Sequence, residues 1–319
     1  QPYVAGKFSA NGGVAAFTEG NATTPSELAV VDGVGRVRTL TDLNHALHEA
    51  VHFATAEEHT ATSSVDKREI QYWVMYPPNF DPADSYPLVL QIHGGPQAAY
   101  GPHFAANNQL YAAAGYVVVY SNPRGSTGYG DEFVQTISHN FPSQDYDDLM
   151  DVVDATIAAG FIDEERLYVT GGSGGGTLTA WIVGKTGRFR AAVAVNPVIN
   201  WTSSALTMDL NKLLVNHFFA DLPWNDPMGS WSRSPLSLVG KVTTPTMLMT
   251  GEQDMRTPIT EAEQFFNALQ IEGVDTALVR VPGASHWIES RPSQLIAKVN
   301  AILAWFERYG EAAVASEDK

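Results

Sequence analysis

The strongest constraint on the fold is a change of rhythm along the chain. Residues 1 to about 60 contain short β-rich runs separated by turns, whereas from about Glu69 apolar runs alternate with segments long enough for helices. Alternating strands and helices are typical of a largely parallel sheet that is covered on both faces. We therefore expect a β-rich segment at residues 1–64 and an α/β domain at residues 65–319.

The local patterns place the elements of these two regions. In the α/β region, apolar runs predict strands at 70–76, 88–92, 117–121, 167–170, 191–195, 246–250 and 277–281. Periodic apolar positions predict helices at 146–159, 177–185, 260–269 and 294–308. In the β-rich segment, runs at 14–17, 27–31 and 37–40 are expected to form antiparallel strands.

The composition excludes several classes of partner. A formal net charge of −16 repels nucleic-acid phosphates and anionic lipid headgroups, so we expect neither nucleic acid nor membrane as a partner. The longest apolar runs fall short of the roughly 20 residues that span a bilayer. Because the chain has no Cys, disulfides, thiolate metal sites and a Cys nucleophile are excluded, and both cytoplasmic and periplasmic or secreted locations stay open.

Ser173 lies in the motif G-G-S-G-G at residues 171–175, which has the form G-x-S-x-G. The motif follows the predicted strand 167–170 and precedes the predicted helix that starts at residue 177. In this context the motif is typical of a nucleophile elbow, in which glycines permit a strained turn that exposes the serine hydroxyl. We therefore predict that Ser173 is a nucleophile.

A nucleophilic serine needs a histidine base that is oriented by an acid. Asp254 and His286 meet this need, because each follows a predicted strand and the chain order Ser, Asp, His matches such sheets. Glu252 is the second choice for the acid because it lies earlier in the same loop, and His217 is expected to pack in an apolar helical stretch. These residues predict a Ser-His-Asp hydrolase of the α/β-hydrolase fold, without metal or cofactor.

The oxyanion formed during attack needs two fixed N–H donors. One is expected from the amide of Gly174, directly after the nucleophile. The other is expected from the loop H-G-G-P at residues 93–96, which follows the predicted strand 88–92. His93 itself is assigned a structural role because the triad already has a base.

Together, these motifs resemble the prolyl oligopeptidase family of serine peptidases, in particular its acylaminoacyl-peptidase and dipeptidyl-peptidase branches. The resemblance covers about residues 65–309. It is carried by W-V-M-Y-P-P at 73–78, H-G-G-P at 93–96, N-P-R-G-S-T-G-Y-G at 122–130, R-S-P at 233–235 and D-M-R-T-P at 254–258.

The resemblance implies the same triad and places the oxyanion hole at the amides of Gly95 and Gly174. It also implies that Arg256 lies near the substrate pocket, with a structural salt bridge as the alternative role. Members of the family usually carry Tyr directly after the nucleophile, where this chain has Gly174. We expect this glycine to leave more room beside the nucleophile and to change substrate preference.

The family also places a β-propeller before the hydrolase, and residues 1–64 resemble the final blade or two. A propeller needs roughly four to eight blades, more than these residues can form. Since the first residue is Gln1, we expect a carboxyl-terminal portion of a longer protein or one piece of a nicked one. The expected partners are an amino-terminal propeller segment or a companion chain, and a homo-oligomer stays open.

The resemblance implies a serine peptidase that acts on short peptides near their N-terminus. It would release an acylated amino acid or a dipeptide through an acyl-enzyme on Ser173. A carboxylesterase is the alternative, because the same triad attacks esters and fold alone does not choose the substrate. A non-catalytic binding relative is disfavoured because every catalytic element is present.

The predicted triad sets the dependence of activity on pH and metal. The base acts only as neutral imidazole, so kcat/KM should fall as acid protonates His286, and chelators should have no effect. The measurement is a profile of kcat/KM against pH, with and without EDTA. Activity that EDTA removes and a divalent metal restores would contradict this mechanism.

Overall fold

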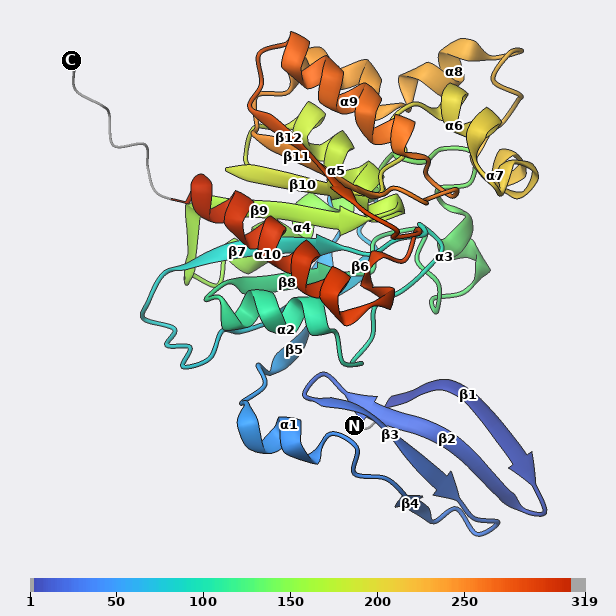
Figure 1. The fold of residues 1–319 in the computed structure, drawn as a ribbon, viewed down its shortest axis with the longest axis vertical. Helices are drawn as coiled ribbons and strands as arrows, with labels where there is room; N and C mark the ends of the chain where they lie inside the picture. Colours follow the sequence, from blue (N-terminus) through green and yellow to red (C-terminus); the bar gives the residue numbers. More distant parts are fainter. Residues whose placement is uncertain (1–2, 311–319) are drawn as a thin grey trace.

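The computed structural model describes residues 3–310, which form two β-sheets (Figure 1). The smaller sheet is antiparallel and has four strands in the order β1-β2-β3-β4. The larger sheet has eight strands in the order β12-β11-β10-β9-β7-β8-β6-β5. The smaller sheet comprises β1 (Tyr3–Asn11), β2 (Val14–Asn21), β3 (Thr24–Val31) and β4 (Val37–Thr39).

The larger sheet is mostly parallel. Only β6 runs against its neighbours, because it pairs antiparallel with both β5 and β8. This sheet and the preceding antiparallel segment confirm the predicted fold class, and every strand predicted for the sheet is present. Its strands are β5 (Ala56–Thr62), β6 (Glu69–Met75), β7 (Tyr86–Ile92), β8 (Val117–Ser121), β9 (Ile162–Gly172), β10 (Ala191–Val195), β11 (Thr246–Gly251) and β12 (Thr276–Val281).

The larger sheet begins earlier in the chain than expected. Strand β5 pairs with β6 from Ala56 to Thr62, so the change from one sheet to the other falls before Ala56 and not at residues 64 and 65. The sequence of β5, A-E-E-H-T-A-T, lacks the alternation of large apolar residues that marks a strand. The division of the chain into two domains stays a prediction.

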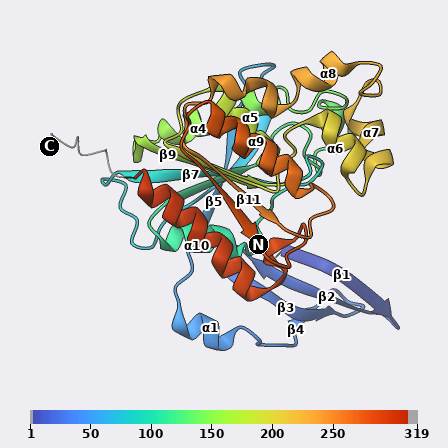
Figure 2. The same cartoon turned by 45° about the horizontal axis from the view of Figure 1, so that its top comes forward.

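Helices cover both faces of the larger sheet (Figures 1 and 2). Successive strand residues point to opposite faces, so Val89 and Val118 belong to one core and Leu90 and Val119 to the other. Helices α2 (Ala106–Ala113) and α10 (Pro292–Arg308) pack on the first core, and α4 (Asp145–Ile157), α5 (Gly174–Lys185) and α9 (Ile259–Ile271) pack on the second.

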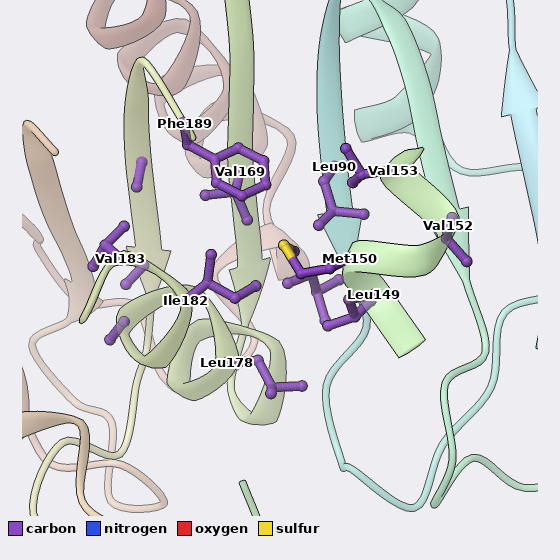
Figure 3. Packing of buried hydrophobic residues seen from close by; sticks show 14 of the residues in the cluster. Leu90, Leu149, Met150, Val152, Val153, Val169, Leu178, Ile182, Val183 and Phe189 are labelled. Carbon is purple, nitrogen blue, oxygen red and sulfur yellow. The ribbon is translucent and has the colours of Figure 1, made fainter. Parts of the chain in front are cut away.

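Figure 3 shows the second core between the sheet and helices α4 and α5. Leu149 and Val153 of α4 and Ile182 of α5 pack with Leu90 and Val169 of the strands. All five side chains are fully buried. The packing holds α5, and therefore the serine at its start, rigidly against the sheet.

The remaining helices are short, and most lie near the carboxyl ends of the parallel strands. Between β10 and β11 the chain forms three short helices, which lie beyond these strand ends in Figure 1, and a 3-10 turn, which packs against α5 and α9. These are α6 (Trp201–Thr207), α7 (Asn211–Phe218), α8 (Pro227–Ser232) and η1 (Pro235–Lys241); elsewhere the chain forms α1 (His45–Ala50), α3 (Asp131–Gln135) and η2 (Ile288–Ser290). Within residues 3–310, every helix is too short or too polar to cross a membrane.

A buried glutamine connects the two sheets. Gln109 of α2 donates from Nε2 to Ala22 O, in the β2–β3 turn, at 2.9 Å. The same amide exchanges hydrogen bonds with the backbone of Ala54, just before β5, at 2.8 and 2.9 Å. Helix α2 therefore holds both the small sheet and the segment that leads into the large one.

Two isoleucines in helices provide a matched test of the second core. Ile182 is fully buried in α5, whereas Ile271 at the end of α9 is 85% exposed. Ile182→Ala should lower the free energy of unfolding by about 2 to 5 kcal/mol, because it removes buried methyl groups and leaves a cavity. Ile271→Ala should change it by less than about 0.5 kcal/mol. Chemical denaturation measures both, and equal losses would contradict this packing.

Candidate active site

Ser173 occupies a strained turn between β9 and α5. Its φ is 59° and its ψ is −120°, a conformation that residues other than glycine rarely adopt. Neighbouring elements hold the turn in place: Ser173 N donates to Val195 O of β10 at 2.9 Å, and Thr177 N of α5 donates to Ser173 O at 2.9 Å. The hydroxyl is thereby presented at the carboxyl end of the sheet, as the motif predicts.

Close backbone packing explains why glycines flank the serine. A Cβ on Gly175 would lie only 2.2 Å from Ile92 O, and a Cβ on Gly171 would lie 2.8 Å from the same oxygen. Helix α5 and strand β9 can approach β7 this closely only because these positions lack side chains. Gly172, by contrast, has open space around it, so the motif constrains Gly171 and Gly175 more strongly.

The predicted acid and base form a direct pair. His286 Nδ1 lies 2.7 Å from Asp254 Oδ2. Because a carboxylate oxygen only accepts, Nδ1 carries the proton and Nε2 keeps the lone pair that a base needs. His286 and Ser173 line the same cavity. The structure thus brings the three predicted triad residues to one site.

Asp254 is buried in a set of hydrogen bonds. Its Oδ1 accepts from the amides of Arg256 at 2.8 Å and Thr257 at 2.9 Å, and its Oδ2 also accepts from Thr257 Oγ1 at 2.9 Å. Burial by itself raises the pKa of Asp254, but His286 and the Thr257 hydrogen bonds bring the pKa below its ordinary value. Asp254 therefore stays ionised at mildly acidic pH and keeps its negative charge beside the imidazole.

Sequence reasoning missed Asn196, which joins the loops that carry the acid and the base. Its Nδ2 donates to His286 O at 2.8 Å, and its Oδ1 accepts from Gly251 N at 3.3 Å. The side chain is 3% exposed, and the backbone has φ 46°, a region that Asn tolerates better than most residues. Its position at the carboxyl end of β10, directly before Pro197, was the available signal.

The two alternative residues lie elsewhere. Glu252 faces Arg280, with 3.3 Å between Oε1 and Nε, and it makes no ion pair with His286. His217 belongs to α7, where its carbonyl oxygen accepts from His139 N at 3.0 Å, and it is not part of the cavity lining. The geometry therefore favours Asp254 as the acid and His286 as the base.

The two glycines that are predicted to supply the oxyanion donors lie next to each other. Gly174 is the first residue of α5, so its amide has no acceptor within the helix. A Cβ on Gly174 would lie 2.8 Å from both C and O of Gly95, which shows how closely the two loops approach. Gly95 and Gly174 both line the cavity that contains Ser173.

This packing overturns the expectation that Gly174 leaves extra room. The space that a side chain would occupy is filled by the backbone of Gly95 and Pro96, whose nitrogen would lie 3.1 Å from the added Cβ. The absence of a side chain lets the H-G-G-P loop move closer to the nucleophile. A tyrosine at this position would require that loop to shift.

His93 supports the oxyanion loop, as its assigned structural role requires. Its ring lies 2.6 Å from Gly94 O through Nδ1 and 3.0 Å from Ser126 Oγ through Nε2. Because a carbonyl oxygen only accepts, Nδ1 donates to Gly94 O, and the Ser126 hydroxyl in turn donates to Pro123 O at 2.6 Å. Burial lowers the pKa of His93 although the hydrogen bond to Gly94 opposes this, so the ring stays neutral.

The N-P-R-G-S motif at 122–126 is held in place by the buried side chain of Arg124. Arg124 is 2% exposed, and it donates to the two carboxylate oxygens of the fully buried Asp148 at 2.8 Å each. It also donates to Ser63 Oγ at 2.9 Å. These bonds fix the backbone of the motif, and Ser126 at its end lies next to the His93 ring.

The triad opens into a cavity of about 500 Å³. Part of its lining, here called the apolar wall, comes from Phe141, Val198, Trp201, Met208, Leu210 and Phe218. Arg233 of the R-S-P motif positions this apolar wall, because its Nη1 donates to Phe218 O at 2.7 Å and to Phe141 O at 3.2 Å.

Arg256 lies at the same cavity and forms the salt bridge that was the alternative to substrate contact. Its Nε lies 2.6 Å from Asp209 Oδ1, and Asp209 N donates to Met255 O at 2.9 Å. Arg256 nevertheless lines the cavity, so the salt bridge orients the guanidinium beside the substrate space. Within residues 3–310, no three His, Asp or Glu side chains are grouped to hold a metal ion.

A serine at a nucleophile elbow, in one cavity with the histidine of a His-Asp pair, is typical of a serine hydrolase of the α/β-hydrolase fold. The family model of the prolyl oligopeptidase family matches residues 102–312. This chain therefore belongs to the prolyl oligopeptidase family, which confirms the resemblance drawn from the motifs.

Individual relatives agree with this assignment. The chain is 40% identical over 288 residues to "Uncharacterized peptidase YuxL" of Bacillus subtilis, covering 89% of this chain and 44% of that protein. It is 33% identical to "Probable dipeptidyl-peptidase 5" of Aspergillus terreus, covering 78% of this chain and 35% of that protein. The solved Pyrococcus horikoshii acylaminoacyl peptidase superposes with a TM-score of 0.91 at 25% identity, covering 99% of this chain and 51% of that one. The chain thus spans about half or less of the length of these proteins.

The two acidic residues of the 251–254 loop provide a test of the triad. Asp254→Asn should lower kcat on the order of 10⁴-fold, because the imidazole loses the acceptor that orients it. Glu252→Gln removes the same charge two residues away and should leave kcat near the wild-type value. Steady-state kinetics on one chromogenic substrate decides between them, and the reverse pattern would mean that the acid is misassigned.

Proposed function

We propose that this chain is the catalytic part of a serine peptidase that cleaves short peptides near their N-terminus. It releases an acylated amino acid or a dipeptide. The observation that carries the proposal is the apolar wall, which lies in the same cavity as the nucleophile and the two backbone donors. The names of the relatives, a dipeptidyl-peptidase and an acylaminoacyl peptidase, support the same class of substrate.

The mechanism follows from the donors and acceptors of the site. His286 Nε2 takes the proton of Ser173 Oγ as this oxygen attacks the peptide carbonyl. The amides of Gly95 and Gly174 stabilise the resulting oxyanion. His286 then gives its proton to the leaving amine, which departs and leaves an acyl-enzyme on Ser173. A water molecule, activated by the same imidazole, releases the acyl part and restores the hydroxyl.

The apolar wall suits the side chain of the residue that supplies the carbonyl. Trp201, Phe218 and Phe141 form an aromatic surface, with ring centroids of Trp201 and Phe218 5.1 Å apart. Large apolar side chains gain binding free energy from such a surface because they leave water. We therefore propose an aromatic or large aliphatic residue on the acyl side of the scissile bond, with Arg256 beside it.

We also propose that a β-propeller segment or companion chain covers the small sheet. Strands β1 and β4 are its edges, and an uncovered edge offers unpaired backbone groups to other strands. Val14, Leu28 and Val37 of this sheet are each at least 39% exposed. The greater length of the relatives is consistent with a further segment that would limit access to short peptides.

A panel of chromogenic substrates tests the proposal. Acetyl-aminoacyl and free dipeptidyl anilides with an apolar residue before the scissile bond should give a higher kcat/KM than simple acyl esters. Ser173→Ala should lower kcat on the order of 10⁶-fold and abolish labelling by a fluorophosphonate. A preference for simple esters with no anilide cleavage would indicate a carboxylesterase, and labelling that persists in Ser173→Ala would refute the nucleophile.

A further inference from the structure

Part of the cavity lining, here called the polar wall, has no role in the mechanism above. It consists of Gln91, Tyr100, Asn107, Glu289 and Lys298. These residues come from β7, the segment before α2, α2 itself, η2 and α10. They lie far apart in the sequence, so no motif announces them.

The charged members of this polar wall form an ion pair with one buried and one accessible partner. Lys298 Nζ contacts Glu289 Oε1, and the exposed fractions of the two side chains are 7% and 36%. Burial alone raises the pKa of Glu289, but the Lys298 ammonium brings the pKa below its ordinary value. Glu289 is therefore an ionised carboxylate at the cavity, with Lys298 buried beside it.

Two amide oxygens of the wall, those of Asn107 and Gln91, are acceptors without a partner among the described residues. Asn107 directs its Nδ2 toward Glu289 Oε1 at 3.4 Å, while its buried Oδ1 has no hydrogen-bond partner among the described residues. Gln91 is 9% exposed, and its Oε1 likewise has no partner within residues 3–310. Each of these two oxygens can accept a hydrogen bond from a ligand group that donates, such as an ammonium or a guanidinium.

The chain path connects this wall to the histidine that serves the leaving group. His286 must give its proton to the leaving amine, so the leaving residue lies next to the imidazole. Trp287 directly follows His286 and Glu289 comes two residues later; the rings of His286 and Trp287 have centroids 5.8 Å apart. Trp287 is 71% exposed, so its face is free to cover a cationic side chain.

We propose that Glu289, Asn107 and Trp287 form a leaving-group subsite that selects peptides with Lys or Arg directly after the scissile bond. The carboxylate pairs with the cation, and the Asn107 carbonyl oxygen accepts a further hydrogen bond. Lys298 positions Glu289 and is not itself a ligand. This inference rests on the proposed peptidase function.

The test compares three peptides, acetyl-Phe-X-Ala-amide with X as Lys, Gln or Glu, and uses acetyl-Phe p-nitroanilide to detect the peptidase activity itself. For the wild-type chain, kcat/KM should be at least about fivefold higher for Lys than for Glu, with Gln between them. The ratio of the Lys value to the Glu value is the readout, because a general loss of activity or of folded protein cancels in it.

The deciding variant is Glu289→Gln combined with Lys298→Met, which removes both charges and leaves no unpaired ammonium buried. The ratio should fall by about fivefold or more in this variant. The double variant leaves the net charge unchanged, whereas Glu307→Gln, on the exposed side of α10, removes one negative charge away from the cavity and should keep the ratio. This control separates the subsite from the general attraction of a chain with net charge −16 for cations.

The outcomes separate the subsite from the proposed function. If the wild-type chain cleaves the anilide but the ratio is near one, or if the ratio is unchanged in the double variant, the subsite is overturned and the peptidase function stands. If the ion pair has only a structural role, the double variant should lower kcat/KM for all three peptides by the same factor. The ratio is then unchanged, which also overturns the subsite. If neither the anilide nor any peptide is cleaved, the peptidase function itself fails.

Discussion

The backbone contact between α5 and the end of β7 determines the geometry of the whole site. Gly175 lies so close to Ile92 O and His93 O that a Cβ would come within 2.2 and 2.7 Å of them. This contact fixes the start of α5, where Ser173 is held in its strained conformation. It equally fixes the residue that leads into the H-G-G-P loop. The nucleophile and the oxyanion loop are thus positioned by one packing interface, which explains why both sequences are rich in glycine.

Buried polar side chains fix the backbone of the loops around the cavity in a similar way. Arg124 and Asp148 support the segment beneath His93, and Arg233 holds the backbone of Phe141 and Phe218. Glu261 of α9 accepts from the amides of Ile199 and Asn200 at 2.9 and 2.8 Å, at the entry to α6. Buried charges are costly unless they are fully paired, so each of these groups fixes one backbone geometry and disfavours others. The substrate cavity is therefore built from irregular segments that are nonetheless rigidly specified.

The triad could be predicted from the sequence because each of its residues is recognised from its near neighbours in the chain. A strand, the loop after it and the residue type are each visible in a short window, and Ser173, Asp254 and His286 all meet that description. Strand β5 escaped prediction because its polar residues carry no apolar alternation. Asn196, Glu289 and Lys298 escaped because their roles depend on contacts between distant segments. For Gly174, the sequence showed that a side chain is missing, but only the packing shows that backbone fills the space.

The contact between Gly174 and Gly95 also restricts how this site can change over evolutionary time. A side chain at position 174 requires the neighbouring loop to have moved first, whereas the loop can drift outward freely while the glycine is present. The order in which substitutions occur in the two segments therefore matters. Lineages that share the triad but differ at this position should differ in the loop as well, and exchanging one segment alone between them would disrupt both.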